Sequence, residues 1–225
     1  MIKNIVFDLD GTLLDTKQVD NLVVNIMFED YGVPKDITKC FYSLLVLNSP
    51  HDKFSSALYR RWLWQIALGA DISINKADYC YRSWEEARRF MVEKCFNLDW
   101  LLDNLAEEDF NIVIATSGDT YTQSTKLSYM NICYPFFVFD KRANGFEKTD
   151  VGSWHTFFDL FDLGLDTLVV GNSFEHDIEM PQILGRSVAL AEWYEKANTF
   201  QSSIEIKSFD NCGKFLDYCI SLKRQ

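Results

Sequence analysis

The segment Ile5-Val-Phe-Asp-Leu-Asp-Gly-Thr-Leu-Leu14 joins an apolar run to an acidic turn. Its first three residues are consecutive and apolar, which is typical of a short strand that is buried on both faces. The Asp-Leu-Asp-Gly-Thr sequence that follows favours a turn, because Asp and Gly readily adopt turn conformations. Period-two geometry at the end of the strand predicts that the side chains of Asp8 and Asp10 point the same way. The segment therefore predicts a buried strand with two carboxylates at its carboxyl end.

Apolar strands that end in polar turns recur further along the chain, and they alternate with helical patterns. Alternation of this kind indicates βαβ units, so we expect an α/β fold: a Rossmann-like parallel sheet with helices on both faces. Ligands of such sheets bind outside the carboxyl ends of the strands, so the polar residues at 8–12, 116–118 and 171–177 should converge. The predicted strands are 111–115, 136–139, 166–170, 186–190 and a last one near 203–207, and the predicted helices are 120–131, 153–161, 177–184 and 211–222.

Residues 17–97 differ in character from the rest of the chain. Val, Ile and Thr are sparse there, whereas Leu, Ala, Arg and Glu are common, and this composition favours helices. The last of the predicted helical segments spans residues 76–96. We therefore predict two domains: a core formed by residues 1–16 and 98–225, and an all-helical domain over 17–97 that is inserted after the first strand.

Bulk composition excludes several classes of partner. The net charge of −11 disfavours nucleic acids and anionic membrane surfaces, which are bound through Lys and Arg. The six cysteines include no CxxC pair, and their spread is typical of buried thiols in a reduced cytosol. The start of the chain has no pattern of a signal peptide, and no apolar run approaches the ~18 residues of a membrane span. We expect a cytoplasmic protein with no nucleic-acid or membrane partner; its oligomeric state is left open.

The two carboxylates of the opening segment suit phosphoryl transfer. Two carboxylates that lie close together repel, so one is expected to stay protonated unless a cation intervenes. One ionised carboxylate can attack phosphorus, while its partner holds a proton for the leaving oxygen. Gly11 allows the backbone to turn sharply beside a ligand.

Four segments, in this order, resemble the motifs of the haloacid dehalogenase (HAD) superfamily, whose members are mostly phosphatases. The resemblance covers nearly the whole chain, and this family often inserts a helical cap, of the C1 type, where residues 17–97 lie. The first motif is highly specific, and the second and third are weak when taken alone. The four segments are Ile5–Leu14, Ile112-Val-Ile-Ala-Thr116-Ser117, Glu147-Lys148-Thr-Asp150 and Val169-Val-Gly-Asn-Ser-Phe-Glu-His-Asp177.

The resemblance implies a Mg²⁺-dependent phosphomonoester hydrolase that acts on a small phosphorylated metabolite. Asp8 would form an aspartyl-phosphate intermediate, and Asp10 would protonate the leaving group and then activate water. The implied phosphate-binding residues are Thr116, Ser117 and Lys148, and the implied metal ligands are Asp8, Asp10 through its backbone carbonyl, Asn172 and Asp177.

Some assignments within the motifs have competitors. Lys141 competes with Lys148 for the third motif, and the interval from Lys148 to Gly171 is closer to that usual in the family. The fourth motif usually reads Gly-Asp-Ser, so Asn172 is a departure, and we expect a neutral ligand that weakens Mg²⁺ binding. We expect Thr12 to shape the turn and His176 to lie in a solvated loop.

Two other functions remain open from the sequence. Phosphomutases of the family use the same nucleophile, so the motifs do not separate a mutase from a phosphatase. A catalytically silent binding or regulatory protein is also compatible with the fold, and Asn172 is its only support. Dehalogenation is disfavoured, because the metal-free dehalogenases lack the second Asp of the first motif and Asp10 is present here.

Overall fold

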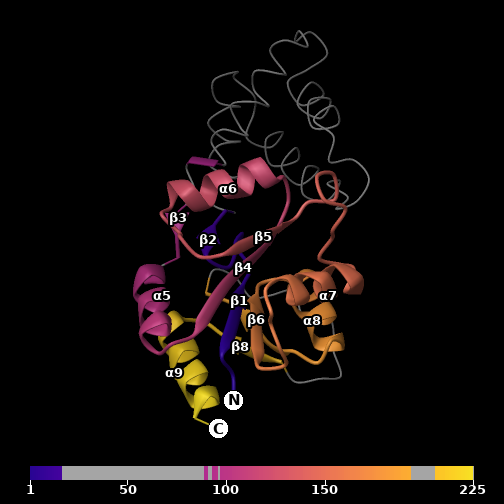
Figure 1. Ribbon diagram of the computed structural model, residues 1–225. Helices are drawn as coiled ribbons and strands as arrows, with labels where there is room; N and C mark the ends of the chain where they lie inside the picture. The colour runs from indigo at the N-terminus through magenta and orange to yellow at the C-terminus, as the bar shows by residue number, and fades with distance from the viewer. Residues whose placement is uncertain (17–88, 91–92, 96, 194–205, 225) are drawn as a thin grey trace, which may run out of the picture. The chain divides into compact units, whose positions relative to one another are not determined.

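The chain divides into two compact units, Met1–Asp15 with Glu93–Gln225 and Thr16–Val92. The computed structural model describes residues 1–16, 89–90, 93–95, 97–193 and 206–224, which lie almost entirely in the first unit. The predicted all-helical domain over 17–97 falls largely outside the described residues, so it stays a prediction. The first unit is built around a six-stranded sheet with helices on both sides (Figure 1).

The sheet is parallel throughout, with the strand order β5-β4-β1-β6-β7-β8. From β1 the chain moves outward through β4 and β5, and then, on the other side, through β6 to β8. This reversal makes the carboxyl end of β1 the switch point at which ligands of such sheets bind. The predicted α/β Rossmann-like fold is thus confirmed. The strands are β1 (Asn4–Phe7), β4 (Asn111–Ser117), β5 (Phe136–Phe139), β6 (Thr167–Gly171), β7 (Ser187–Ala191) and β8 (Lys207–Phe209).

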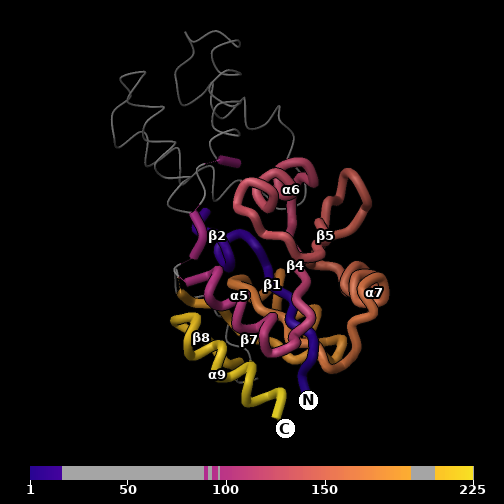
Figure 2. Tube along the Cα trace, turned by 60° about the vertical axis from the view of Figure 1, so that its left-hand side comes forward, coloured from indigo at the N-terminus to yellow at the C-terminus, as the bar shows by residue number. Residues whose placement is uncertain are grey.

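Two pairs of helices cover opposite faces of the sheet. Helix α5 packs against α9 on one face (Figure 2), and α7 packs against α8 on the other (Figure 1). Asp119, Asp150 and Asn211 cap the amino ends of α6, α7 and α9, because each side chain accepts a hydrogen bond from a backbone N–H three residues on. The described helices are α5 (Leu98–Glu107), α6 (Thr120–Tyr129), α7 (Val151–Leu160), α8 (Glu179–Ile183) and α9 (Cys212–Lys223), and a π-helical turn, η1 (Phe174–Ile178), precedes α8.

Strand β1 is buried on both faces, as its apolar sequence predicts. Val6 joins a core cluster with Trp154 and Phe157 of α7. Phe7 points to the other face, where its ring meets that of Phe215 edge-on at a centroid distance of 5.7 Å. Helices therefore pack against β1 on both faces of the sheet, and this packing fixes the position of the residues that follow the strand.

Three local features differ from the sequence predictions. Glu93 and Lys94 form a strand, β3, that pairs antiparallel with β2 (Leu14–Asp15), because a backbone ladder here overrides helix propensity. Strand β4 continues through Ser117, since its pairing with β5 extends to Phe139. The helix predicted over 177–184 begins earlier, as η1.

None of the described cysteines forms a disulfide, and three of them are buried, as the sequence suggested, whereas Cys133 is exposed. Among the described residues, no helix combines the length and the apolar character that crossing a bilayer requires.

Candidate active site

Asp8 lies directly after β1, at the switch point of the sheet. Its backbone N–H donates to the carbonyl of Val170 on the neighbouring strand, and Asp8 as a whole is only 7% exposed. One carboxylate oxygen, Oδ2, accepts a hydrogen bond from the hydroxyl of Thr12 at 3.1 Å. Thr12 therefore orients Asp8 directly, in addition to the turn-forming role that the sequence suggested.

Lys148 joins Asp8 to a second buried carboxylate. Its Nζ lies 2.5 Å from Asp8 Oδ1 and 2.6 Å from Asp177 Oδ1. The other oxygen of Asp177 accepts from the backbone N–H of Ser173, and the indole of Trp154 donates to the carbonyl of Lys148. The structure thus brings together three of the residues singled out in the sequence.

The competing lysine takes no part in this cluster. Lys141 is exposed and forms an ion pair with Glu147 instead. Of the two candidates, only Lys148 contacts Asp8 or Asp177.

Burial in this cluster raises the pKa of Asp8 to about 7, and the charge of Asp177 adds to the rise. Lys148 acts in the opposite direction but does not cancel it. For Lys148, burial alone would lower the pKa, but the charges of Asp177 and Asp8 outweigh it and raise the pKa. Lys148 is therefore a cation. Its single positive charge does not offset the burial of Asp8 and the charge of Asp177, so ionisation of the Asp8 carboxyl is favoured only if further positive charge is present.

Asp10 has partners of its own beside this cluster. Its carboxylate is bonded to Lys126, whose Nζ lies 2.8 and 2.9 Å from the two oxygens, and to Gln123, whose Nε2 lies 2.8 Å from Oδ2. These partners differ from those of Asp8, and the prediction that the two side chains point the same way stays a prediction. The strand ends at Phe7, and the N–H groups of residues 12, 13 and 14 all donate to the carbonyl of Leu9. A tight turn replaces the extended backbone on which the prediction relied, so each carboxylate has its own lysine.

Thr116 and Ser117 occupy the end of β4, the strand next to β1. Phe7 pairs with Ile114, so Thr116 lies at about the level of the residues that follow β1. Thr116 is 1% exposed, and its hydroxyl has no hydrogen-bond partner among the described residues. Because buried hydroxyls are normally satisfied, this orphaned group suits a ligand oxygen. Ser117 is exposed, and its carbonyl accepts from Gln123 at 2.7 Å.

Asn172 lies against the turn that follows Asp8. Gly11 has a φ of 82°, and a Cβ added there would clash with the amide nitrogen of Asn172. In the described part of the chain, no hydrogen bond involves the Asn172 amide. Its oxygen is therefore available to a ligand, and glycine at position 11 is what leaves room for the side chain.

These oxygen donors fit Mg²⁺. No group of three or more His, Cys, Asp or Glu side chains within the described residues has the geometry of a metal site. The donors are instead two carboxylates, from Asp8 and Asp177, together with the amide oxygen of Asn172 and the carbonyl of Asp10. Mg²⁺ takes oxygen ligands and keeps several waters, so such a short set of protein donors is sufficient.

The sequence interpretation missed Gln123 and Lys126. Both are buried on α6, although the segment was read only as a helix. Their spacing, together with Leu127, is the signal that could have found them, because positions i, i+3 and i+4 share one helix face.

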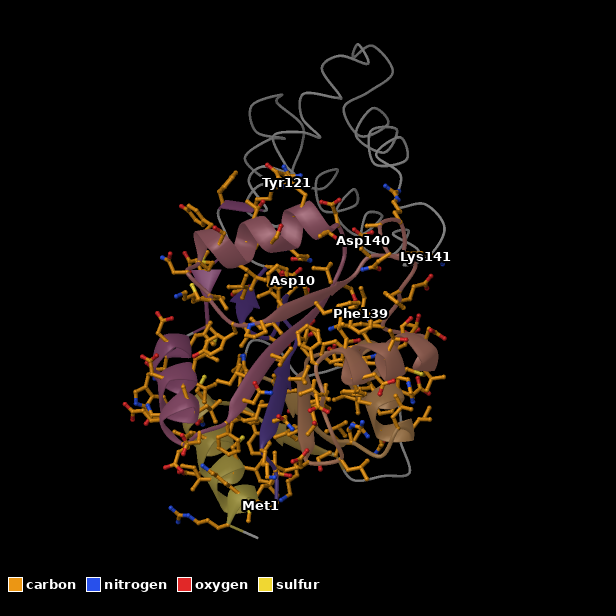
Figure 3. The ribbon with its side chains drawn as sticks, in the orientation of Figure 1. Met1, Asp10, Tyr121, Phe139, Asp140 and Lys141 are labelled. Atoms are coloured by element: carbon orange, nitrogen blue, oxygen red, sulfur yellow. The ribbon has the colours of Figure 1, made fainter. Side chains whose placement is uncertain are left out.

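His176 was expected in a solvated loop, but it is half-buried in η1, with Nδ1 3.3 Å from the hydroxyl of Ser173. Figure 3 shows Asp10 and Asp140 at the same end of the sheet, opposite to Met1.

The chain is similar to known hydrolases. The sequence profile of the haloacid dehalogenase-like hydrolase family matches residues 5–149. The HAD-hydrolase YfnB of Bacillus subtilis is 24% identical over 197 residues, which is 81% of each chain. The crystal structure of YfnB bound to magnesium superposes with a TM-score of 0.74 at 19% identity and covers 97% of this chain and 99% of that one.

Two other solved structures share the fold but carry different names. The 2-haloacid dehalogenase of Pseudomonas syringae has a TM-score of 0.66 at 18% identity and covers 98% of this chain and 99% of that one. The HAD phosphatase of Thermococcus onnurineus has a TM-score of 0.63 at 14% identity and covers 97% of this chain and 98% of that one. At these identities the likeness is one of fold, so the choice between the two chemistries depends on the residues of this chain.

Proposed function

Since the chain belongs to the family of haloacid dehalogenase-like hydrolases, we propose that it is a Mg²⁺-dependent phosphatase that hydrolyses a small phosphorylated metabolite. One observation carries the proposal: the Asp8 carboxylate is buried, bonded to Lys148 and Thr12, and lies near the orphaned hydroxyl of Thr116. A nucleophile, a cation and an unused donor at one switch point are what the transfer of an anionic phosphoryl group requires.

In the first step, an oxygen of Asp8 attacks phosphorus, and the bond between phosphorus and the leaving oxygen breaks. The leaving alcohol takes a proton from the carboxyl group of Asp10. Lys148 and the Thr116 hydroxyl bind phosphoryl oxygens and offset the charge that accumulates there, and Ser117 adds a further donor. The product of this step is an alcohol and an aspartyl-phosphate at Asp8.

In the second step, water attacks the phosphorus of the aspartyl-phosphate and Asp10 accepts the proton of that water. The bond between phosphorus and the Asp8 oxygen breaks, which returns the carboxylate and releases inorganic phosphate. The presence of Asp10 supports this hydrolytic course, because it supplies the acid and base that both steps need.

Mg²⁺, when bound, would supply positive charge to the phosphoryl oxygens and to Asp8. Asp8, the Asp10 carbonyl, Asn172 and Asp177 would hold it. The raised pKa of Asp8 supports this requirement for a cation, because the ionised nucleophile is disfavoured without one. The acidic composition of the chain supports a partner other than nucleic acid or a membrane, such as a small metabolite, and the absence of disulfides among the described cysteines supports a cytoplasmic location.

The test is release of phosphate from p-nitrophenyl phosphate, with and without Mg²⁺, by the wild type and by Asp8→Asn. We expect Mg²⁺-dependent turnover in the wild type and its loss in the variant. A wild type that binds Mg²⁺ yet releases no phosphate would favour a silent binding protein. A sugar 1-phosphate that gives an isomer rather than free phosphate would favour a mutase, and a screen of phosphorylated metabolites would then identify the substrate.

A further inference from the structure

Lys126 is a buried lysine that the mechanism above does not use. It is 1% exposed, and its ammonium nitrogen lies 2.8 and 2.9 Å from the two carboxylate oxygens of Asp10. A buried ammonium group is costly unless it is paired and hydrogen-bonded. Asp10 supplies that pairing, so the lysine and the carboxylate are placed for one another.

Gln123 adds a second donor to the same carboxylate from one turn earlier in α6. It is 4% exposed, and its Nε2 donates both to Asp10 Oδ2 at 2.8 Å and to the carbonyl of Ser117 at 2.7 Å. The amide therefore ties Asp10 to the end of β4, where Ser117 and Thr116 lie. Gly118, with a φ of 130°, leaves room for it, because a Cβ there would lie 3.0 Å from Gln123 Nε2.

Together these contacts fix the orientation of Asp10. A carboxylate on a turn can rotate freely unless donors hold its plane. Among the described residues, one oxygen accepts from Lys126 and the other from both Lys126 and Gln123. Charge-assisted bonds of this kind are the strong ones, and two donors at different points leave the carboxylate a single favourable orientation.

Anchoring of α6 is the simplest alternative explanation, but it accounts poorly for the choice of residues. An apolar pair of similar size would anchor the helix without burying charge, and exchanges of that kind are often neutral or stabilising. Lys148 already holds the other carboxylate of the turn, so the two buried lysines divide the two carboxylates between them.

We propose that Lys126 and Gln123 are positioning residues for Asp10, and that they hold its carboxylate in the orientation in which it exchanges protons with the leaving group and with water. This proposal rests on the proposed phosphatase function. Neither residue touches the substrate; both act through Asp10. Misplacement of a reacting group by about 1 Å can cost on the order of 100-fold in rate, so their loss should be visible in kcat.

The experiment measures kcat and KM for p-nitrophenyl phosphate at saturating Mg²⁺. We expect Lys126→Met to lower kcat by about 10- to 100-fold with KM nearly unchanged. Lys126→Arg, which keeps the charge and can donate twice to a carboxylate, should recover much of the loss. Lys214→Met is the matched control, because Lys214 forms an exposed ion pair with Asp210, and its turnover should equal that of the wild type.

A double-mutant cycle separates positioning from a structural role. If Lys126 acts through Asp10, Lys126→Met should have little further effect in an Asp10→Asn background. An equal fractional loss in both backgrounds would overturn the proposal, and so would an unchanged kcat for Lys126→Met alone. The activated ester keeps the residual turnover of Asp10→Asn measurable, because its leaving group needs little protonation, and the loss of kcat then reports the second step, in which Asp10 accepts the proton of water.

Gln123→Met provides a second route if Lys126→Met fails to fold, as judged by thermal melting. It removes one donor without leaving a charge unpaired, and it should lower kcat by about tenfold and be silent in the Asp10→Asn background. A folded Gln123→Met with wild-type kcat would overturn the proposal in that case. Wild type and Asp8→Asn are assayed alongside: if the wild type has no turnover that depends on Asp8, the phosphatase function and this inference fall together, whereas an active wild type with an unaffected Lys126→Met overturns the inference alone.

Discussion

Lys148 donates to Asp8 across 2.5 Å although 140 positions separate the two residues along the chain. Asp177 lies 2.6 Å from the same ammonium group, so a single cation serves two buried carboxylates. The cluster therefore keeps one uncompensated negative charge when both carboxylates are ionised. This deficit governs how stability and activity should respond to mutation, pH and metal.

Replacement of Lys148 by Met should destabilise the protein and abolish most of its activity. Removing one partner of a buried ion pair typically costs about 3–5 kcal/mol, because the remaining charges stay buried without compensation. Turnover should fall by on the order of 100-fold or more, since phosphoryl charge would lose its nearest cation. Denaturation in urea and phosphate release measure the two effects. Lys141→Met is the control: this exposed lysine pairs with Glu147, and its loss should change neither quantity. The opposite pattern would assign the third motif to Lys141.

The metal-free protein should lose stability as pH rises toward 8, and Asp8 should account for the loss. Burial, and then the charge of Asp177, raises the pKa of Asp8 from 3.8 to about 7. The folded protein thus holds this proton more tightly than the unfolded chain, so the stabilising contribution is complete below pH 3.8 and is lost as pH rises through about 7. In Asp8→Asn the side chain at position 8 does not titrate, so this contribution to the pH dependence of stability is absent.

The comparison is the free energy of unfolding in a chelator, at intervals from pH 5 to pH 8, for wild type and Asp8→Asn. Wild type should lose stability relative to the variant across this range. Groups such as Asp140 and Asp150, whose pKa values are lowered by hydrogen bonds, are present in both proteins and cancel in the difference. Parallel curves would mean that Asp8 ionises freely and needs no extra cation.

Much of the fold could be predicted because its signals are local. Runs such as Asn111–Ala115 are largely apolar and β-branched, and each is followed by turn residues, so the strands and the turns after them could be predicted directly, whereas the strand order in the sheet came only from the structure. The convergence of Asp8 and Asp177 followed from the rule that strand ends of parallel sheets gather at one edge, whereas Lys148 was assigned to the site by the resemblance to the family's third motif. The short strands β2 and β3 escaped this reasoning, because they pair with each other although they lie far apart in sequence.

The surroundings of Asp10 could not be predicted in this way. A lysine in a polar helix is usually solvated, and the sequence of α6 is polar enough to favour that reading. Lys126 is buried against Asp10, and the turn that places Asp10 there depends on backbone bonds to the carbonyl of Leu9 that no spacing rule reports. The spacing of Gln123, Lys126 and Leu127 marks a shared face of the helix, but only the tertiary arrangement shows that Asp10 is the partner of that face.

Asn172→Asp should strengthen Mg²⁺ binding. The amide oxygen is a neutral donor, and a carboxylate at the same place adds one negative charge next to a cluster that already lacks positive charge. The measurement is isothermal titration of Mg²⁺ into wild type and variant, without substrate. We expect about a tenfold or greater fall in Kd, whereas equal affinities would show that residue 172 does not contact the metal.

Gly11→Ala should weaken the metal site through Asn172. Two effects act at this position: a φ of 82°, which is costly for alanine, and a clash of the new Cβ with the Asn172 amide. Gly145→Ala separates them, because its φ of 80° is nearly the same but nothing lies within 4 Å of the added Cβ. Both variants should lose about 1–2 kcal/mol from backbone strain, and Gly11→Ala alone should lose Mg²⁺ affinity. An equal Mg²⁺ affinity in the two variants would contradict the packing of Asn172 against Gly11.

Thr116→Val should uncouple stability from phosphate binding. The buried hydroxyl of Thr116 has no partner among the described residues, so replacing it with a methyl group of the same shape should be neutral or stabilising in the ligand-free protein, by up to about 1–3 kcal/mol. Thr167→Val is a matched control, because Thr167 is also a fully buried threonine whose hydroxyl lacks a described partner, but it lies at the opposite end of its strand, where β6 begins. Inorganic phosphate with Mg²⁺ should raise the melting temperature of the wild type and of Thr167→Val, and should do so much less for Thr116→Val, since only Thr116 lies at the end of the sheet where Asp8 and Lys148 meet. An equal phosphate-induced rise in all three proteins would remove Thr116 from the phosphate site.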